Sequence, residues 1–285
     1  MNRANPLNAF MRQPKIYIRL PSNGEFWPSD SLVMTETGEF PVYSMTAKDE
    51  LMLKVPDALI SGQAVVEVIQ NCMPNIKNAW HIPAIDLDVI LIAIRLATYG
   101  EKMEVPIELN NDETEINYQI DLRNVLDALL NQISWDPVVP INDDLTIYVR
   151  PLTYNKISSS AVKTFETQKI IDAVNNNDLS QEDKLRIFKE SFGKLTEISI
   201  GIIENSIYKI DSSAGGTEDP MFIKEFIDNV DKEIFNKVQS HIEMLRERNS
   251  VKPIRIPVTD ELRQKGITGE FVDVPLVFDP STFFA

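Results

Sequence analysis

Alternating polar and apolar residues predict short strands in the first half of the chain. The run at 14–20 alternates charged and apolar side chains, which is typical of a strand with one buried face. A second strand is expected at 40–45, and at a sheet edge, because Pro41 cannot donate to a ladder. Another is expected at 145–149. The sequence also predicts two hairpins, one from strands at 103–109 and 114–120 and one from strands at 252–258 and 270–278.

Helix signals separate these strands. Thr46 and Asp49 form a capping-box pattern that opens a short helix through Leu53. A second helix is expected where apolar residues share one face between Ala64 and Cys72. A strongly apolar helix opens near Pro83 and closes at Gly100. Its apolar run at 89–94 is too short to span a bilayer.

The pattern changes to long helices after Thr153. One helix is expected from Tyr154 to Val174, and a second follows the capping pattern at Ser180. A flexible Gly-rich linker is expected at 213–217, before a last helix at 221–248. In the second helix the spacing predicts a heptad seam for antiparallel pairing, made by Leu185, Phe188, Phe192, Leu195, Ser199 and Ile202.

These elements predict an α+β fold in three parts. Residues 1–150 form an α+β domain with β-hairpins, and 151–250 form a helical-hairpin region. Residues 251–285 form a β-hairpin-like tail. We expect this tail to pack back on the body, because leaving Phe283 and Phe284 in water forgoes about 1.5–3 kcal/mol each. The alternative is a tail that is itself a plug for a partner.

Charge and composition narrow the function. The chain has 28 Lys and Arg against 43 Asp and Glu, a net charge of −15. Such a chain is poorly suited to nucleic acid or to an anionic membrane surface. One cysteine and two histidines cannot supply a four-ligand zinc site. No glycine-rich phosphate loop and no serine-hydrolase elbow occur in the sequence. We therefore expect a binding protein that is not an enzyme, with no cofactor, metal or small-molecule substrate.

Two polar positions in apolar helices have a structural and a functional interpretation. Arg95 lies in the apolar helix, and buried charges are normally paired, so Asp86 or Asp88 is its expected partner. The alternative is that Arg95 meets a carboxylate of another protein. Cys72 lies on the apolar face of its helix and is expected to be an inert core residue.

Several segments in order resemble the base-plate hub assembly family of T-even-type contractile-tailed phages. They span nearly the whole chain, and it is their order, more than any one of them, that is specific. The segments are Leu20–Trp27, Pro41–Glu50, Leu59–Cys72 with Pro83 and Asp86, Ile94–Gly100, Val149–Tyr154 and Phe278–Phe284. Related members often carry Cys-x-x-Cys knuckles in two hairpins. Here Val105–Glu108 and Ile256–Thr259 stand in those places without cysteine, so backbone ladders and apolar side chains must hold them.

The resemblance implies a non-enzymatic tail protein that helps to build the base-plate hub, as a structural subunit or an assembly chaperone. Its partners would be other base-plate or hub proteins, met in the host cytoplasm during assembly and in the tail base plate. The alternatives are a tail-carried cell-wall hydrolase with two carboxylates, and a general helical adaptor. Six residues are candidates for partner binding: Phe188, Phe192, Leu195, Ile202, Phe283 and Phe284. The competing interpretation of the helical seam is internal packing.

Overall fold

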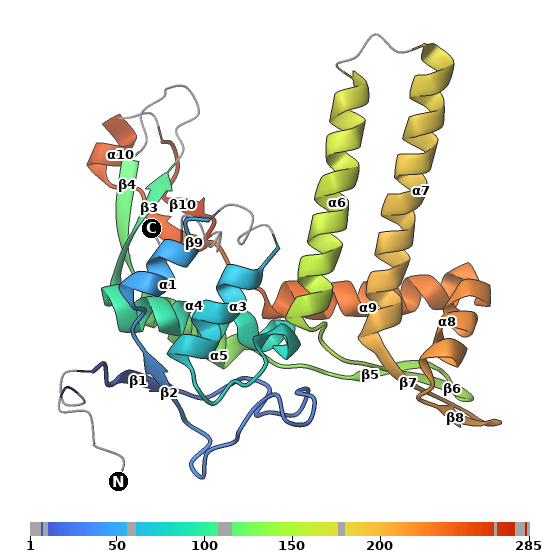
Figure 1. Ribbon diagram of the computed structural model, residues 1–285. Coiled ribbons are helices and arrows are strands. Elements are labelled where there is room, and N and C mark those ends of the chain that lie inside the picture. Colours follow the sequence, from blue (N-terminus) through green and yellow to red (C-terminus); the bar gives the residue numbers. More distant parts are fainter. Residues whose placement is uncertain are drawn as a thin grey trace.

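Small separate sheets and helices of very different lengths give the chain the expected α+β fold. The computed structural model describes residues 7, 11–55, 61–107, 116–175, 180–264, 267–276 and 283. Two bodies, each around its own core, lie side by side, and a long pair of helices projects away from them (Figure 1).

The first body surrounds one very apolar helix. Helix α4 (Ala84–Tyr99) is buried along most of its length, and Val89, Ile90 and Ile94 are fully buried. A helix that is apolar on all sides needs neighbours on all sides. The described elements of this body are β1 (Pro14–Ile18), β2 (Phe40–Tyr43), α1 (Ala47–Met52), α3 (Gln63–Cys72), the 3-10 helix η2 (Ala79–His81), β3 (Lys102–Ile107), β4 (Ile116–Asp121) and α5 (Leu122–Gln132).

Local signals set the helix ends in this body. The hydroxyl of Thr46 accepts from the backbone N–H of Asp49, whose side chain accepts from the backbone N–H of Thr46. Asp121 caps α5 by accepting from the N–H of Arg123 at 2.8 Å. Gly100 ends α4 with φ +87°, a conformation that an L side chain rarely adopts.

The second body is built on a four-stranded antiparallel sheet in the order β5-β6-β7-β8. Helices α8 and α9 pack with this sheet around a core that includes Ile147, Val238 and Leu245. The sheet pairs β6, which precedes residue 150, with β7, which follows the long helices, so it joins strands from both sides of the expected boundary at 150. Its elements are β5 (Val138–Asn142), β6 (Leu145–Val149), β7 (Ile207–Ser212), β8 (Gly215–Thr217), α8 (Pro220–Asn229) and α9 (Lys232–Asn249).

Two expectations for this region are wrong. The segment at 213–217 is no flexible linker, because it turns the chain from β7 to β8, with Gly215 at φ +132°. The last helix is two helices, because α8 stops at Asn229 and Asp231 caps α9 through the N–H groups of Glu233 and Ile234. The apolar repeat predicted one continuous helix, but the capping residue Asp231 begins a new helix in the middle of that repeat.

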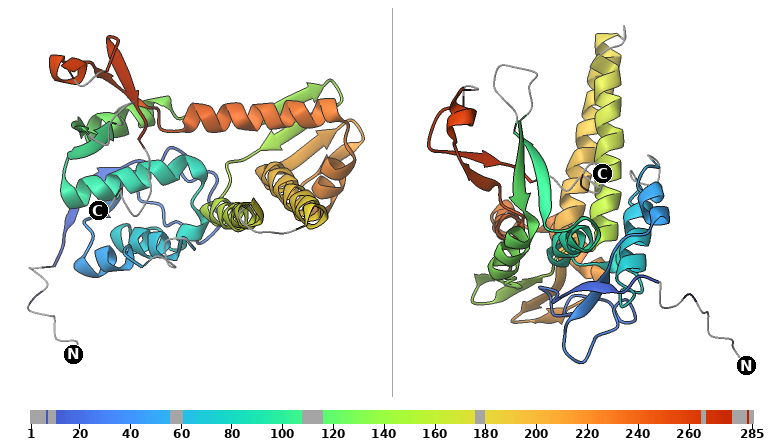
Figure 2. Two further views of the ribbon diagram at one scale, coloured as in Figure 1. Left: turned by 90° about the horizontal axis from the view of Figure 1, so that it is seen from above. Right: turned by 90° about the vertical axis from the view of Figure 1, so that its left-hand side faces the viewer.

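The end of the chain returns to the first body. Strands β9 (Ile254–Pro257) and β10 (Phe271–Val274) pair antiparallel, with α10 (Asp260–Gln264) between them. Ile256, Val258 and Val274 are buried in the first core, and so is Phe283. Figure 2 shows this hairpin beside the β3–β4 hairpin.

The projecting pair consists of α6 (Tyr154–Asn175) and α7 (Gln181–Ser206), which pack antiparallel and project beyond both bodies (Figure 1, and the right view of Figure 2). Ser180 caps α7 by accepting from the N–H of Asp183. The asparagine-rich sequence at 175–178 indicates a break between the two helices, and most of it lies outside the described residues. Among the described helices, none has the length and apolar character needed to cross a bilayer.

Candidate functional site: the helical hairpin and the junction at its base

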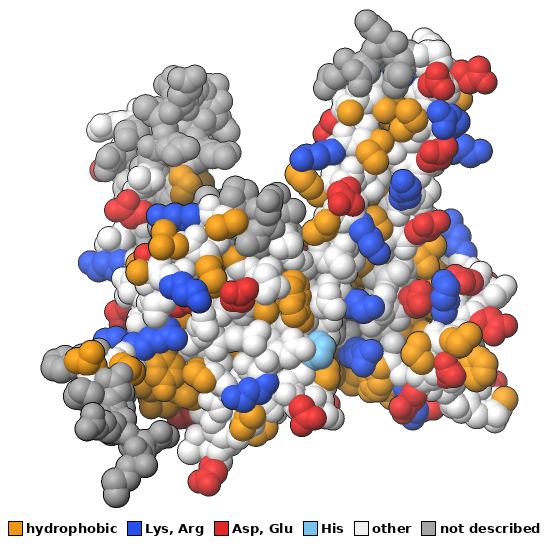
Figure 3. Space-filling model, viewed as in Figure 1, with side chains coloured by type: hydrophobic (Ala, Val, Ile, Leu, Met, Phe, Trp, Pro, Cys, Tyr) orange, Lys and Arg blue, Asp and Glu red, His pale blue; other side chains and the backbone are white. Residues whose placement is uncertain are grey.

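The α6–α7 hairpin has small side chains inside and large apolar side chains outside. Thr167, Val174 and Ser191 are almost fully buried within it, whereas Leu185 is 71% exposed and Phe192 is 59% exposed. Phe165 and Ile170 of α6 are also exposed. On the face drawn in Figure 3, apolar side chains lie among the charged residues of the hairpin. Two helices with this arrangement leave apolar surface that a further chain can cover.

The residues of the predicted heptad seam therefore fall into two groups, half-buried and exposed. Phe188, Leu195 and Ile202 are half-buried, as expected for residues beside a helix–helix contact. Leu185 and Phe192 belong to the same heptad pattern and are exposed. Residues 185, 188 and 192 share a helix face by their spacing of three and four. That face, turned partly to solvent, makes Phe188 and Phe192 the best placed of the candidate partner-binding residues.

The two candidates at the end of the chain do not join this surface. Phe283 is 1% exposed and lies in the first core, so it has no side-chain surface for a partner in this conformation. Its backbone carbonyl accepts a hydrogen bond from Arg95. Phe284 lies outside the described residues.

The base of α6 is held by close contacts with the first body. The Tyr154 ring stacks on Trp80 with centroids 5.6 Å apart. The Ser158 hydroxyl donates to the carbonyl of Ser61 at 3.1 Å. A Cβ at Gly62 would lie 2.9 Å from the Ser158 Oγ, and Gly62 itself has φ +78°. The hairpin thus rises from a packed base, and burial raises the pKa of Tyr154 there to about 12.

A buried carboxylate beside this base organises the loop that follows β1. Asp86, in the first turn of α4, accepts from the backbone N–H of Ser22 at 2.9 Å and from the Ser22 hydroxyl. It also accepts from the Trp27 indole N–H at 2.7 Å. Burial raises the pKa of Asp86 to about 6, although these hydrogen bonds act in the opposite direction. The turn at Ser22–Trp27 is thereby fixed on α4.

Several segments that carry the family resemblance meet at this point. The N–H of Ala84 donates to the carbonyl of Leu152, and the N–H of Tyr154 donates to the carbonyl of Ile82, both at 2.8 Å. The loop that binds Asp86 reaches the second body, where Phe26 meets Trp135 edge to face at 6.3 Å. We call this meeting point of both bodies and the hairpin base the junction.

The expected ion pair of Arg95 is wrong. Asp86 is occupied by Ser22 and Trp27, and no described residue pairs with Asp88. Arg95 instead lies over the rings of Tyr99 and Phe283, each 5.2 Å from the guanidinium carbon. Its Nε has no hydrogen-bond partner among the described residues. Residues that end the chain, far away in sequence, supply contacts that helix spacing could not reveal.

A cavity of about 250 Å³ lies in the junction, between the two cores. Its wall is mostly apolar, with Leu87, Trp135 and Ile242 among the residues that line it. Asp88 and Arg246 are its charged residues. Burial raises the pKa of Asp88 to about 6. Sequence reasoning considered Asp88 only as a partner for Arg95 and missed the cavity, because its walls come from five separate parts of the chain.

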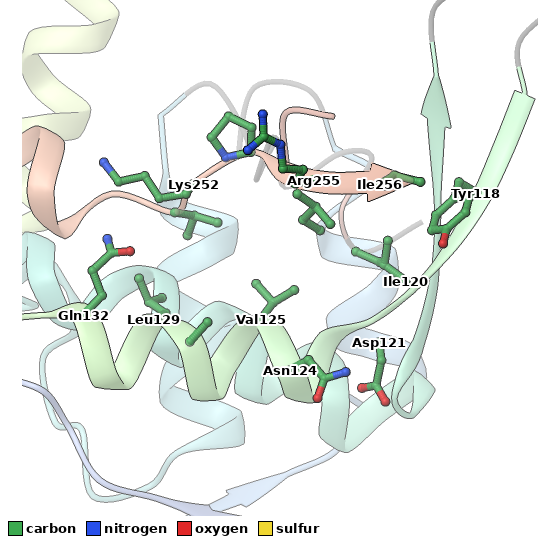
Figure 4. Close-up of a pocket in the computed structure, with 14 residues that line it drawn as sticks. Tyr118, Ile120, Asp121, Asn124, Val125, Leu129, Gln132, Lys252, Arg255 and Ile256 are labelled. Carbon is green, nitrogen blue, oxygen red and sulfur yellow. The ribbon is translucent and has the colours of Figure 1, made fainter. Parts of the chain in front are cut away.

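A second cavity, of about 370 Å³, lies between α5 and the two hairpins (Figure 4). Val125, Leu129 and Ile120 form an apolar floor, and Lys252 and Arg255 lie at the opposite side. Arg255 already pairs with Asp273 at 3.5 Å and lies over the ring of Phe271. Lys252 donates to the carbonyl of Glu247, so both cations of this cavity have partners within the protein.

The hairpins that flank this cavity are held as expected for chains without cysteine knuckles. Val105 and Ile107 of β3 are buried in the first core, as are Ile256 and Val258 of the other hairpin. The described residues contain no cluster of three or more His, Cys, Asp or Glu with metal-binding geometry. Cys72 is fully buried, and burial raises the pKa of its thiol to about 12, so it is an inert core residue at neutral pH.

Comparison with known proteins agrees with this arrangement of segments. Residues 13–261 match the family described as T4 bacteriophage base plate protein, which covers both bodies and the hairpin. A search of curated proteins and a search of solved structures each found no match. The match extends over most of the 285 residues. The chain belongs to the T4 bacteriophage base plate protein family.

Proposed function

We propose that this protein acts in assembly of the base-plate hub through protein–protein contacts, as a structural subunit or an assembly chaperone. In this proposal it meets other base-plate or hub proteins in the host cytoplasm, and the α6–α7 hairpin is its main docking element. The observation that carries the proposal is the exposure of Leu185 and Phe192 on a helix pair that stands clear of both bodies. Exposed aromatic anchors are typical of docking surfaces.

The charge distribution supports the hairpin as the point of contact. The chain has a net charge of −15, and residues 154–206 contribute seven Lys and Arg against eight Asp and Glu. The hairpin is therefore nearly neutral, whereas the rest of the chain is strongly acidic, so an acidic partner would be repelled less by the hairpin than by the two bodies. The alternative of a two-carboxylate hydrolase is less well supported, because the two carboxylates that line a pocket between α6 and α7, Glu166 and Glu197, are both exposed. Each of the two cavities above has one described carboxylate, Asp88 in one and Asp121 in the other, and glycoside hydrolysis normally uses two.

The test is co-purification of base-plate assembly intermediates from infected cells, with Phe192→Asp compared with the wild-type protein. We expect Phe192→Asp to lose co-purification while its helical circular dichroism stays unchanged. The matched control is Lys189→Asp, at an exposed position on the same helix, which changes the charge by two instead of one. Unfolding of Phe192→Asp, or an equal loss with Lys189→Asp, would contradict the proposal.

Mass spectrometry of purified virions beside assembly intermediates distinguishes the two roles. A structural subunit is found in both, whereas a chaperone is found only in the intermediates. This measurement needs no substitution and does not depend on the hairpin being the docking element.

A further inference from the structure

Two acidic side chains in the first turns of α4 have opposite surroundings. Asp86 is fully buried and accepts three hydrogen bonds from Ser22 and Trp27. Asp88 is half-buried, and no described residue donates to it or forms an ion pair with it. Burying a charged group without a partner costs free energy. Asp86 has a structural role, and Asp88 needs another explanation.

The other polar groups around Asp88 are already satisfied. Asn249 accepts from the N–H of Ser134 at 2.8 Å, and its amide donates to the carbonyls of Ser134 and Leu245. The hydroxyl of Ser206 donates to the carbonyl of Ile202 at 2.8 Å. Of the polar side chains that line the junction cavity, only the two charged ones have no partner among the described residues: Asp88 and Arg246.

These two charges do not need a ligand equally. Arg246 is exposed on α9, so water solvates its guanidinium and it gains little from a partner. Asp88 faces a mostly apolar cavity, where a positive charge would offset its lost hydration. The cavity of about 250 Å³ is smaller than most cofactor sites, and suits a single long side chain better.

Arginine fits this cavity better than lysine. A guanidinium is planar, is more weakly hydrated than an ammonium, and stacks on aromatic rings. Trp135 lines the cavity and could receive it, while Leu87 and Ile242 would cover the aliphatic stem. We infer that the junction cavity is a socket for an arginine side chain of another base-plate protein, with Asp88 binding the guanidinium. The identity of the donor as a base-plate protein rests on the proposed function; the socket itself does not.

The socket is tested on the full-length protein with butylguanidinium, which reproduces an arginine side chain, and with butylurea as its uncharged analogue. Binding is followed by the NMR signals of Asp88 and Trp135. At pH 7.5 we expect butylguanidinium to bind at least tenfold more tightly than butylurea. Binding should weaken about tenfold at pH 5, where about a tenth of Asp88 is ionised. The other titratable side chain in the cavity, Arg246, keeps its charge at both values.

Two variants complete the test. Asp88→Asn should abolish the preference for the cation, and Arg246→Gln should strengthen cation binding because it removes a like charge from the wall. Equal binding of the two probes, no binding of either, or a preference that survives Asp88→Asn would overturn the inference. The inference would also be overturned if the wild-type protein bound neither probe and only the Arg246→Gln variant bound butylguanidinium, since Arg246 would then itself occupy the socket. The two proposals can fail separately. If the probes do not bind as expected, but Phe192→Asp loses co-purification and Lys189→Asp keeps it, the socket is wrong and the proposed function stands.

Discussion

Asparagine substitutions at Asp86 and Asp88 are expected to change the free energy of unfolding by different amounts, because only Asp86 has hydrogen-bond partners to lose. The two positions are two residues apart on α4, and both substitutions remove one negative charge at nearly constant volume. Asp86→Asn replaces one carboxylate oxygen by an NH₂ group that cannot accept, so either the backbone N–H of Ser22 or the indole N–H of Trp27 loses its acceptor. Asp88→Asn removes a charge that no described residue pairs with.

The magnitudes follow from the hydrogen bonds and from the pKa. For Asp86→Asn two effects oppose each other. An orphaned buried donor costs about 1–3 kcal/mol, whereas removal of a carboxylate whose pKa burial raises to about 6 recovers a similar amount, so we expect little net change at pH 7.5. For Asp88, a pKa of about 6 in the folded protein against 3.8 in the unfolded chain corresponds to at most about 3 kcal/mol. Residual exposure of the side chain reduces this. We expect Asp88→Asn to stabilise the protein by about 1–2 kcal/mol at pH 7.5.

The sign of the pH dependence distinguishes this cause from a general effect of substitution. A carboxyl whose pKa is raised by folding favours the folded state at low pH, and this contribution is lost as the pH rises through about 6. The advantage of Asp88→Asn should therefore be absent near pH 3.8 and complete above pH 6. Urea unfolding of the wild type and both variants at several pH values measures it. A destabilising Asp88→Asn at pH 7.5 would refute the reasoning, because it would reveal a partner for Asp88.

Three further substitutions test local features. Gly62→Ala should destabilise by about 1–3 kcal/mol in urea unfolding, because it combines a left-handed φ with a Cβ 2.9 Å from the Ser158 Oγ; an unchanged midpoint would contradict this. Thr46→Ala should cost about 1 kcal/mol by loss of the capping box, and Thr46→Ser should restore most of it. Phe192→Ala should stay within about 0.5 kcal/mol of the wild type, because the side chain is mostly exposed; a larger loss of thermal stability would mean that the ring is packed.

The sequence predicted those parts of the fold that depend on neighbours along the chain. Capping residues such as Thr46, Asp121 and Ser180 bind backbone N–H groups two or three residues away, so their pattern is visible in the sequence. Strand alternation located both hairpins for a similar reason. Strands β5, β7 and β8 were missed, because β7 continues directly from α7 and the glycines at 215–216 are as typical of a linker as of a tight turn.

The candidate site was predicted less well, because it depends on which surfaces remain uncovered. Heptad spacing indicated that Phe188 and Phe192 share a helix face, but spacing does not say whether a neighbour covers that face. Thr167 and Ser191, polar residues outside that heptad pattern, are almost fully buried instead. Asp88 gave no signal of its own beside Asp86. Only the positions of Ser22 and Trp27 distinguish the satisfied acid from the unsatisfied one.

The exposed apolar residues of the hairpin cannot by themselves hold a partner tightly. Full burial of an aliphatic or aromatic side chain contributes about 1.5–3 kcal/mol. Phe165, Ile170, Leu185 and Phe192 are each roughly half exposed or more, so covering all four contributes roughly 4 kcal/mol. A micromolar complex needs about 8 kcal/mol after the cost of association. A partner of the hairpin must therefore touch a second surface, and the junction lies at the hairpin base.

This argument predicts how two substitutions combine. Ser206 lines the junction cavity, and Phe192 lies about 20 Å farther along α7 at 1.5 Å per residue. Sites this far apart usually act independently, so Phe192→Asp and Asp88→Asn should multiply in their effects on partner affinity. Binding of the purified variants to the partner recovered from assembly intermediates measures each effect and the double variant. If the double variant binds no more weakly than Phe192→Asp alone, the junction contributes nothing and the hairpin must find its additional contact surface elsewhere.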